Sequence, residues 1–187
     1  MLNIKISDSG QKVIEKLGID IEESLYRIVE NIPKMDLIGL NCISVTDEPG
    51  EWKEHLINAS GTYFEKTKTA PAYIELYLSR LFAYINKTES SKLMIPFQDI
   101  CLAQTVFHEI GHHVEKTRSH GINKKKRETF AKNYEHKLLS RYLTSNAASI
   151  NACFQNLDAI AEEKGLSREI LSKMKDGWES HIKNMVN

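Results

Sequence analysis

Hydrophobic positions in the first quarter of the chain follow a helical period and then give way to an extended pattern. Apolar residues recur every three to four positions through 8–32, with Gly18 inside this segment and Pro33 at its end. The spacing predicts helix, divided into two short helices around Gly18 and ended by Pro33. Residues 37–46 are rich in apolar residues and precede the turn sequence 47–50, so we expect a strand there.

Two more strands and two long helices are predicted farther along. Strands are expected over 62–66 and 73–78, the second because apolar and polar side chains alternate along it. A helical period follows over 97–117 and again over 124–144. Strands that precede helices along the chain indicate an α+β fold.

Length and composition fit one domain. The chain has 187 residues, 41% of them hydrophobic, and it contains no repeat and no convincing linker. We therefore expect a single domain over 1–187. Residues 1–60 are a candidate N-terminal extension of that domain, and residues 146–187 are expected to form C-terminal helices.

Charge and cysteine content argue against several classes of protein. Lys plus Arg and Asp plus Glu number 25 each, so no net charge favours nucleic acid or an anionic membrane. Cys42, Cys101 and Cys153 form no C-x-x-C pair and leave an odd thiol, which favours a reducing compartment. The chain shows no signal-peptide pattern and no run of 18 apolar residues. We expect a cytoplasmic protein without membrane association, while export by a route that needs no signal peptide stays open.

The sequence His108-Glu109-Ile110-Gly111-His112 is the strongest indication of chemistry. On a helix, His108 and His112 lie one turn apart on one face, where two imidazoles can bind one Zn²⁺. Glu109 is turned off that face, toward a metal-bound water that it can deprotonate. Gly111 costs a helix about 1 kcal/mol relative to Ala, so it suggests that another backbone or a metal ligand approaches closely there.

The residues around this motif support a helix. Asp99 is a suitable N-cap for it, and Pro96 lies just outside the expected start. Apolar residues recur at helical spacing through the segment. They are Ala103, Val106, Phe107, Ile110 and Val114.

A third metal ligand is needed, and two carboxylates compete for the role. An extended motif with glycine at 115 and histidine at 118 is absent, because the chain has Glu115 and Arg118 there. The remaining common solution is a carboxylate from the next helix, where Glu128 and Glu135 lie on one face. One could bind the metal while the other accepts a hydrogen bond from a ligand histidine. We favour Glu128 as the ligand, because Ala131 one turn later lets two helices approach closely, and keep Glu135 as the alternative. His113, His120 and His136 could also compete.

H-E-I-G-H at 108–112, followed by E-x-F-A at 128–131, resembles the small gluzincin metallopeptidases. These include the minigluzincins, the ImmA/IrrE-type peptidases and the catalytic domain of the anthrax lethal factor group. The resemblance covers about residues 70–140. It implies a zincin-like fold, with a small twisted mixed sheet above the active-site helix and a helical lower part. The edge strand of such a sheet usually binds substrate by backbone pairing, and here it would be Tyr73–Leu78.

The resemblance also implies a cofactor and an activity. Zn²⁺ would be bound by His108, His112 and Glu128, with Glu109 as general base. The function expected is a zinc-dependent endopeptidase that hydrolyses peptide bonds of a protein or peptide substrate with a zinc-activated water. The alternative is a catalytically silent binding or regulatory protein on the same scaffold. For either function, an inhibitory or regulatory protein partner stays open.

Other polar residues receive weaker expectations. The group that stabilises the transition state is not identified by the sequence. Its candidates are Tyr63, His120, Tyr134 and Tyr142. His113 lies off the metal face and is expected either to support a ligand or to be exposed. The basic run 124–127 is expected to be a solvated loop or helix start, with contact to an acidic substrate, partner or nucleic acid as the alternative.

Overall fold

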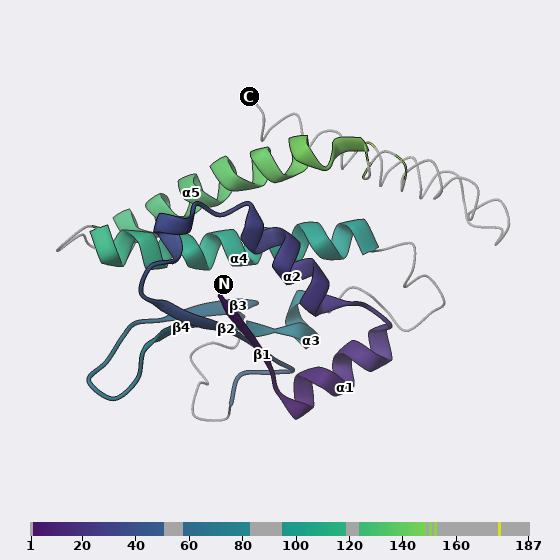
Figure 1. Ribbon diagram of the computed structural model, residues 1–187, viewed down its shortest axis with the longest axis horizontal. Helices are drawn as coiled ribbons and strands as arrows, with labels where there is room; N and C mark the ends of the chain where they lie inside the picture. The colour runs from purple at the N-terminus through teal and green to yellow at the C-terminus, as the bar shows by residue number, and fades with distance from the viewer. Residues whose placement is uncertain are drawn as a thin grey trace, which may run out of the picture. The chain divides into compact units, whose positions relative to one another are not determined.

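The chain forms a mixed four-stranded sheet accompanied by helices, as described by a computed structural model (Figure 1). It describes residues 2–50, 58–82, 95–118 and 124–148, together with residues 150, 152 and 176. The expected α+β class is confirmed. Two compact units are distinguished, Met1–Leu138 and Leu139–Asn187. Most of the helical segment expected over 146–187 falls outside the described residues.

The elements and their order are as follows. Along the chain they are β1 Asn3–Ile6, α1 Asp8–Leu17, α2 Ile21–Glu30, the 3-10 helix η1 Lys34–Leu37, β2 Leu40–Thr46, β3 Gly61–Phe64, β4 Ala72–Tyr77, α3 Leu78–Leu81, α4 Ile95–Arg118 and α5 Lys124–Ser145. The strand order in the sheet is β1-β2-β4-β3. β2 runs parallel to β1 and to β4, whereas β3 is antiparallel to β4. Residues 1–60 therefore supply two strands of the sheet that carries the site described below.

The two N-terminal helices begin and end where the sequence predicts. The Ser7 hydroxyl caps α1 by accepting from the Gly10 N–H at 3.1 Å. Gly18 ends this helix with a φ of 66°, a left-handed conformation that glycine adopts without a steric penalty. The Asp20 carboxylate then caps α2 by accepting from the Glu23 N–H at 2.9 Å. The predicted division around Gly18 is confirmed.

The predicted start of the long helix is wrong. α4 begins at Ile95, so Pro96 and Asp99 lie inside it. Proline is tolerated in a first helical turn, where its missing N–H would have no helical partner. Asp99 is not an N-cap, because its carboxylate instead accepts from the Ser24 hydroxyl at 2.6 Å and pairs with Arg27 at 2.8 Å. A tertiary contact with α2 therefore takes the place of the expected cap.

Two strand predictions also need correction. The segment predicted as strand from residue 37 begins with the end of η1, and β2 starts only at Leu40. β1 was not predicted, because the alternation of Ile4 and Ile6 with Asn3 and Lys5 extends over only four residues. Such a short edge strand leaves little hydrophobic pattern, and its pairing with β2 depends on residues far away in sequence.

The core that supports the site lies between the sheet and α4. α4 packs against β3 and β4 and also contacts α2 and η1 (Figure 1). The apolar stripe predicted from the sequence is buried, since Ala103, Val106, Phe107 and Ile110 are fully inaccessible to solvent. Burying each large side chain contributes about 1.5–3 kcal/mol. Within the described residues, no helix combines the length and the apolar character needed to cross a membrane.

A buried carboxylate ties η1 to the two long helices. Asp36 is 7% exposed, accepts a hydrogen bond from the Tyr134 hydroxyl at 2.6 Å, and forms an ion pair with Arg118 at the end of α4. Since Tyr134 belongs to α5, the side chain of Asp36 connects η1 with both α4 and α5.

Tyr134→Phe removes the hydroxyl and leaves the ring. We expect the free energy of unfolding to fall by about 2 kcal/mol, because a buried carboxylate loses one donor. Urea denaturation followed by circular dichroism measures the change. The matched control is Tyr26→Phe on α2, whose hydroxyl makes no hydrogen bond with the described residues. Equal losses in the two variants would contradict this role of Tyr134.

Candidate metal centre

The two motif histidines project from adjacent turns of α4 and approach each other closely. Their Nε2 atoms lie 3.2 Å apart, and their rings are nearly perpendicular, at 86°. The side chains of His108 and His112 are 22% and 20% exposed, so both remain accessible at the floor of a cleft. The helical spacing thus brings together the two nitrogens that the sequence singled out.

The carboxylate of Glu128 on α5 completes a cluster of three donors. Its Oε2 lies 3.7 Å from His108 Nε2, and its Oε1 lies 3.6 Å from His112 Nε2. In a tetrahedral zinc site, ligand atoms are about 3.3–3.5 Å from one another. Two imidazole nitrogens and one carboxylate oxygen are also donors that zinc prefers. One donor atom from each of the three residues lies within 4.8 Å of the others, so this donor set could hold a zinc ion.

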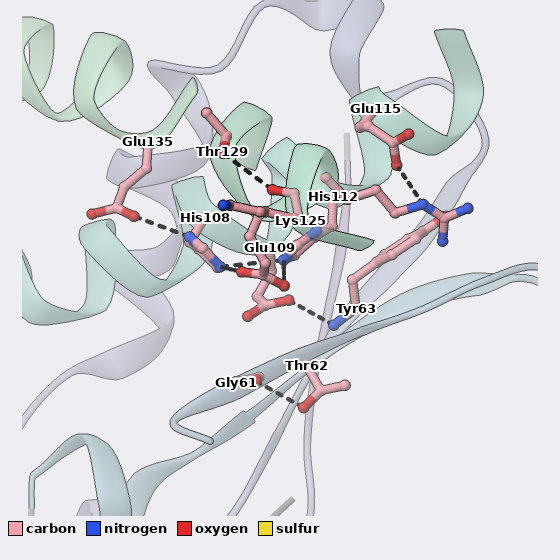
Figure 2. A network of polar contacts seen from close by, with 12 residues as sticks. Gly61, Thr62, Tyr63, His108, Glu109, His112, Glu115, Lys125, Thr129 and Glu135 are labelled. Carbon is pink, nitrogen blue, oxygen red and sulfur yellow. Dashed lines mark hydrogen bonds and ion pairs between the residues drawn. The ribbon is translucent and has the colours of Figure 1, made fainter. Parts of the chain in front are cut away.

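Glu135 lies on the opposite side of the His108 ring (Figure 2). Its Oε2 is 3.0 Å from His108 Nδ1, and its Oε1 accepts from the Gln104 side chain at 2.8 Å. The ionised carboxylate only accepts, so Nδ1 carries the hydrogen and Nε2 presents its lone pair to the cluster. This arrangement favours Glu128 as the third ligand and Glu135 as the group that orients His108.

Electrostatics in the cluster favour a cation. The hydrogen bond to Glu135 raises the pKa of His108, whereas burial and the nearby His108 lower the pKa of His112. Two imidazolium ions this close repel each other, so the pair carries at most one positive charge. Two glutamate carboxylates surround that pair, and a divalent cation would balance them.

The reach of Glu128 depends on close packing of α4 against α5. A Cβ atom built on Gly111 would lie 2.7 Å from the Ala131 Cα and 3.0 Å from its carbonyl oxygen. The first distance is shorter than real Cβ contacts, and the second is tighter than about nine in ten of them. The expectation that Gly111 admits another backbone is confirmed, and Ala131 is the residue that approaches it.

Glu109 lies beside the cluster and is held by the sheet. It is 7% exposed, and its Oε2 accepts from the backbone N–H of Tyr63 at 2.8 Å (Figure 2). Burial raises the pKa of Glu109 to about 7, while His108 and the Tyr63 amide act in the opposite direction. A buried carboxylate with a pKa in this range can both accept and release a proton near neutral pH.

The edge strand beside the site is β3, and the expectation that it would be Tyr73–Leu78 is wrong. β4 lies between β2 and β3, and Leu78 already belongs to α3. The Tyr77 N–H donates to the Ser60 carbonyl, so residue 60 and every second residue after it face β4 with their backbone polar groups. Tyr63 is one of the intervening residues, so its N–H points away from β4. The alternating sequence identified a strand, but the order of strands in a sheet depends on distant pairings.

Charged side chains line one end of the cleft, and among them only Arg127, in the basic run, was a candidate for substrate contact from the sequence. The cleft has a volume of about 660 Å³. We call Glu65, Glu115, Lys116 and Arg127 the charged end of the cleft. Lys116 pairs with Glu65 at 2.8 Å, and Arg127 lies 3.7 Å from Glu65 and 3.6 Å from Glu115. The sequence does indicate two of these residues, because Glu115 and Lys116 follow His112 at i+3 and i+4 and so share its helix face.

Two of the four candidates for a transition-state donor, Tyr63 and Tyr134, have other hydrogen-bond partners. The hydroxyl of Tyr134 donates to Asp36. The hydroxyl of Tyr63 lies 3.2 Å from Nδ1 of His113, whose Nε2 is 3.0 Å from the Ile38 carbonyl. His120 lies outside the described residues, and Tyr142 belongs to the second unit. His113 itself is 1% exposed, so the option of an exposed side chain is wrong.

The basic run at 124–127 is divided between two environments. The side chains of Lys125 and Lys126 are exposed on the first turns of α5, as expected of a solvated helix start. Arg127 is only half-buried and faces the charged end of the cleft. The run is therefore partly surface and partly cleft wall.

Comparison with known proteins identifies no relative. No family model, no curated protein and no solved structure matches this chain. The resemblance to gluzincins therefore rests on residues 108–112 and 128–131, and any function must be supported by the geometry of the site.

Gly111→Ala places a methyl group between α4 and α5. Alanine favours a helix by about 1 kcal/mol over glycine, but overpacking costs about 1–3 kcal/mol and separates the helices. We expect a lower free energy of unfolding and weaker zinc binding, measured by denaturation and by competition with a chromogenic chelator. Adding Ala131→Gly should not restore either property, because the two nearest atoms belong to the backbone. Unchanged stability and zinc affinity would contradict the close packing.

Proposed function

We propose that this protein is a zinc-dependent peptidase with a zincin-like arrangement of its sheet and active-site helix. The observation that supports it is the convergence of His108, His112 and Glu128, which bring one donor atom each within 4.8 Å of the others, beside the buried carboxylate of Glu109. Catalytic zinc sites have three protein ligands and an open position, whereas structural sites are closed by a fourth side chain. The partial exposure of the cluster supports the catalytic type.

Glu109 is the proton carrier in this proposal. A bound zinc ion would supply Lewis acidity, which polarises a peptide carbonyl and lowers the pKa of water to near 7. Glu109 accepts a proton from the attacking water and passes it to the leaving amine nitrogen. The Tyr63 amide holds Oε2 of Glu109, which leaves Oε1 for the transfer.

β3 would bind the substrate backbone as an added strand through its outward groups other than the Tyr63 N–H, which donates to Glu109. β3 runs in the same direction as α4, since Gly61 lies beside Thr105, Tyr63 beside Glu109, and Glu65 beside Lys116. An antiparallel substrate strand would therefore run from the charged end of the cleft toward Gly61. Residues before the scissile bond would face the charged end.

The substrate that fits is an extended polypeptide segment with polar side chains before the cleaved bond. Among the described residues that line the cleft, Tyr63 is the only large side chain with substantial apolar surface. Charged and polar groups on the walls favour substrate groups that can form hydrogen bonds or ion pairs. The buried free cysteine Cys42 agrees with the proposed cytoplasmic location.

A silent binding protein on the same scaffold is the weaker proposal. A site that only holds a metal needs no unligated carboxylate beside it. Glu109 is buried there and bonded to the edge strand, so its presence favours hydrolysis over binding alone.

Glu109→Gln tests the general base. We expect about one zinc per chain by elemental analysis in both proteins, because Glu109 is not a ligand. Chelator-sensitive peptide hydrolysis should fall about 10²- to 10⁴-fold in the variant. His112→Ala, the matched change of a ligand, should lose zinc and activity together. Full activity in Glu109→Gln, or no zinc in the native protein after reconstitution, would refute the proposal.

Glu128→Gln and Glu135→Gln distinguish the third ligand from the group that orients His108. Loss of an orienting carboxylate lowers metal affinity about 10–100-fold, and loss of a ligand should lower it further. Competition with a chromogenic chelator gives both zinc affinities, with Glu22→Gln on the exposed face of α2 as control. The opposite order of effects would make Glu135 the ligand.

A further inference from the structure

We propose that His113, the residue after the second motif histidine, is a positioning residue that fixes Glu109 through Tyr63. The inference rests on the proposed function only in taking Glu109 as the base. His113 is 1% exposed, which is a more complete burial than is usual for histidine. Its ring connects the turn before β2 to the edge strand β3.

The first contact anchors His113 to a fixed backbone point. Nε2 of His113 lies 3.0 Å from the carbonyl oxygen of Ile38. A carbonyl only accepts hydrogen bonds, so Nε2 carries the hydrogen and donates it. The next residue, Gly39, has a φ of 87°, a conformation that favours glycine and that turns the chain into β2.

The second contact holds the ring of Tyr63. Since Nε2 of His113 carries the hydrogen, Nδ1 is an acceptor, and the Tyr63 hydroxyl at 3.2 Å donates to it. The two rings also pack edge to face, with centroids 5.3 Å apart at 64°. The hydroxyl hydrogen of Tyr63 is thereby committed to His113.

The third contact joins Tyr63 to Glu109, the proposed general base. The backbone N–H of Tyr63 donates to Glu109 at 2.8 Å, so Tyr63 is held at both its backbone and its hydroxyl. β3 has four residues and is paired with β4 on one side only. The distance between this edge strand and α4 therefore depends on contacts such as the one between Tyr63 and His113. Ile38, His113, Tyr63 and Glu109 form one continuous series of hydrogen bonds.

Two variants separate this role from simple packing. Tyr63→Phe removes only the hydroxyl, and His113→Phe removes both ring nitrogens while keeping a ring beside Tyr63. Small displacements of a reacting group cost up to about a hundredfold in rate. We expect kcat per bound zinc to fall about 10- to 100-fold in both variants, with KM changing less and zinc content unchanged. The matched control is Tyr73→Phe, on the neighbouring strand and the opposite face of the sheet.

Amide hydrogen exchange gives a readout that does not require activity. At temperatures well below unfolding, the amide at position 63 should exchange faster in both variants than in the native protein, while β4 amides and the Tyr73→Phe protein stay unchanged. Nitrogen-15 spectra of the native protein should show His113 with its hydrogen on Nε2.

Each result decides the proposal. Unchanged exchange at position 63 in both variants, or a His113 hydrogen on Nδ1, overturns it even if the protein is an active peptidase. Faster exchange with unchanged kcat per zinc also overturns it, because Glu109 would then not need this anchoring. A native protein without zinc or hydrolysis refutes the proposed function instead, and exchange at position 63 still reports whether His113 positions the Tyr63 amide.

Discussion

The close approach of α4 and α5 at Gly111 is the constraint on which the site depends. Glutamate side chains are short, so Glu128 and Glu135 reach His108 only if no side chain separates the two helix backbones there. Ala131 lies between these two glutamates in sequence and packs on Gly111. The seven residues from Glu128 to Glu135 span about two helical turns, which lets one carboxylate approach each nitrogen of the same imidazole. The close approach at Gly111 thus accompanies both the position of Glu128 beside the two histidines and the contact of Glu135 with His108.

A second constraint is electrostatic. Glu109, Glu128 and Glu135 surround two histidines at the edge of a protein core, where uncompensated charge is costly. Each carboxylate has polar neighbours within the described residues. Glu135 is bonded to Gln104 and His108, Glu109 to the Tyr63 amide, and Glu128 faces the two Nε2 atoms. These contacts reduce the cost without removing the excess of negative charge, which a divalent cation would neutralise.

Local periodicity predicted the helices and the facing histidines, because an i, i+4 pair meets on any helix. It also favoured Glu128 and Glu135 as candidates for a third metal ligand. Only the geometry of the His108 ring shows which ring nitrogen each carboxylate approaches. The edge strand was assigned to Tyr73–Leu78 and is β3, because strand order follows from pairings between distant segments. Asp99 failed as a cap for the same reason, since its partners on α2 are remote in sequence. Local patterns therefore specify elements, and distant contacts decide where those elements lie.

The burial of Glu109 lowers the stability of the protein at neutral and higher pH. A carboxyl whose pKa rises from 4.5 to about 7 on folding destabilises the protein by about 3 kcal/mol once the pH exceeds both values. A neutral side chain of the same shape would avoid that cost. Sites whose own stability would improve on substitution are commonly those that perform chemistry. The backbone of β3 also holds this carboxylate, because the outward N–H of Tyr63 donates to Glu109 and is not available to solvent or substrate. A scaffold that only binds would gain from neither feature, whereas a hydrolase requires a held, titratable carboxylate beside its metal.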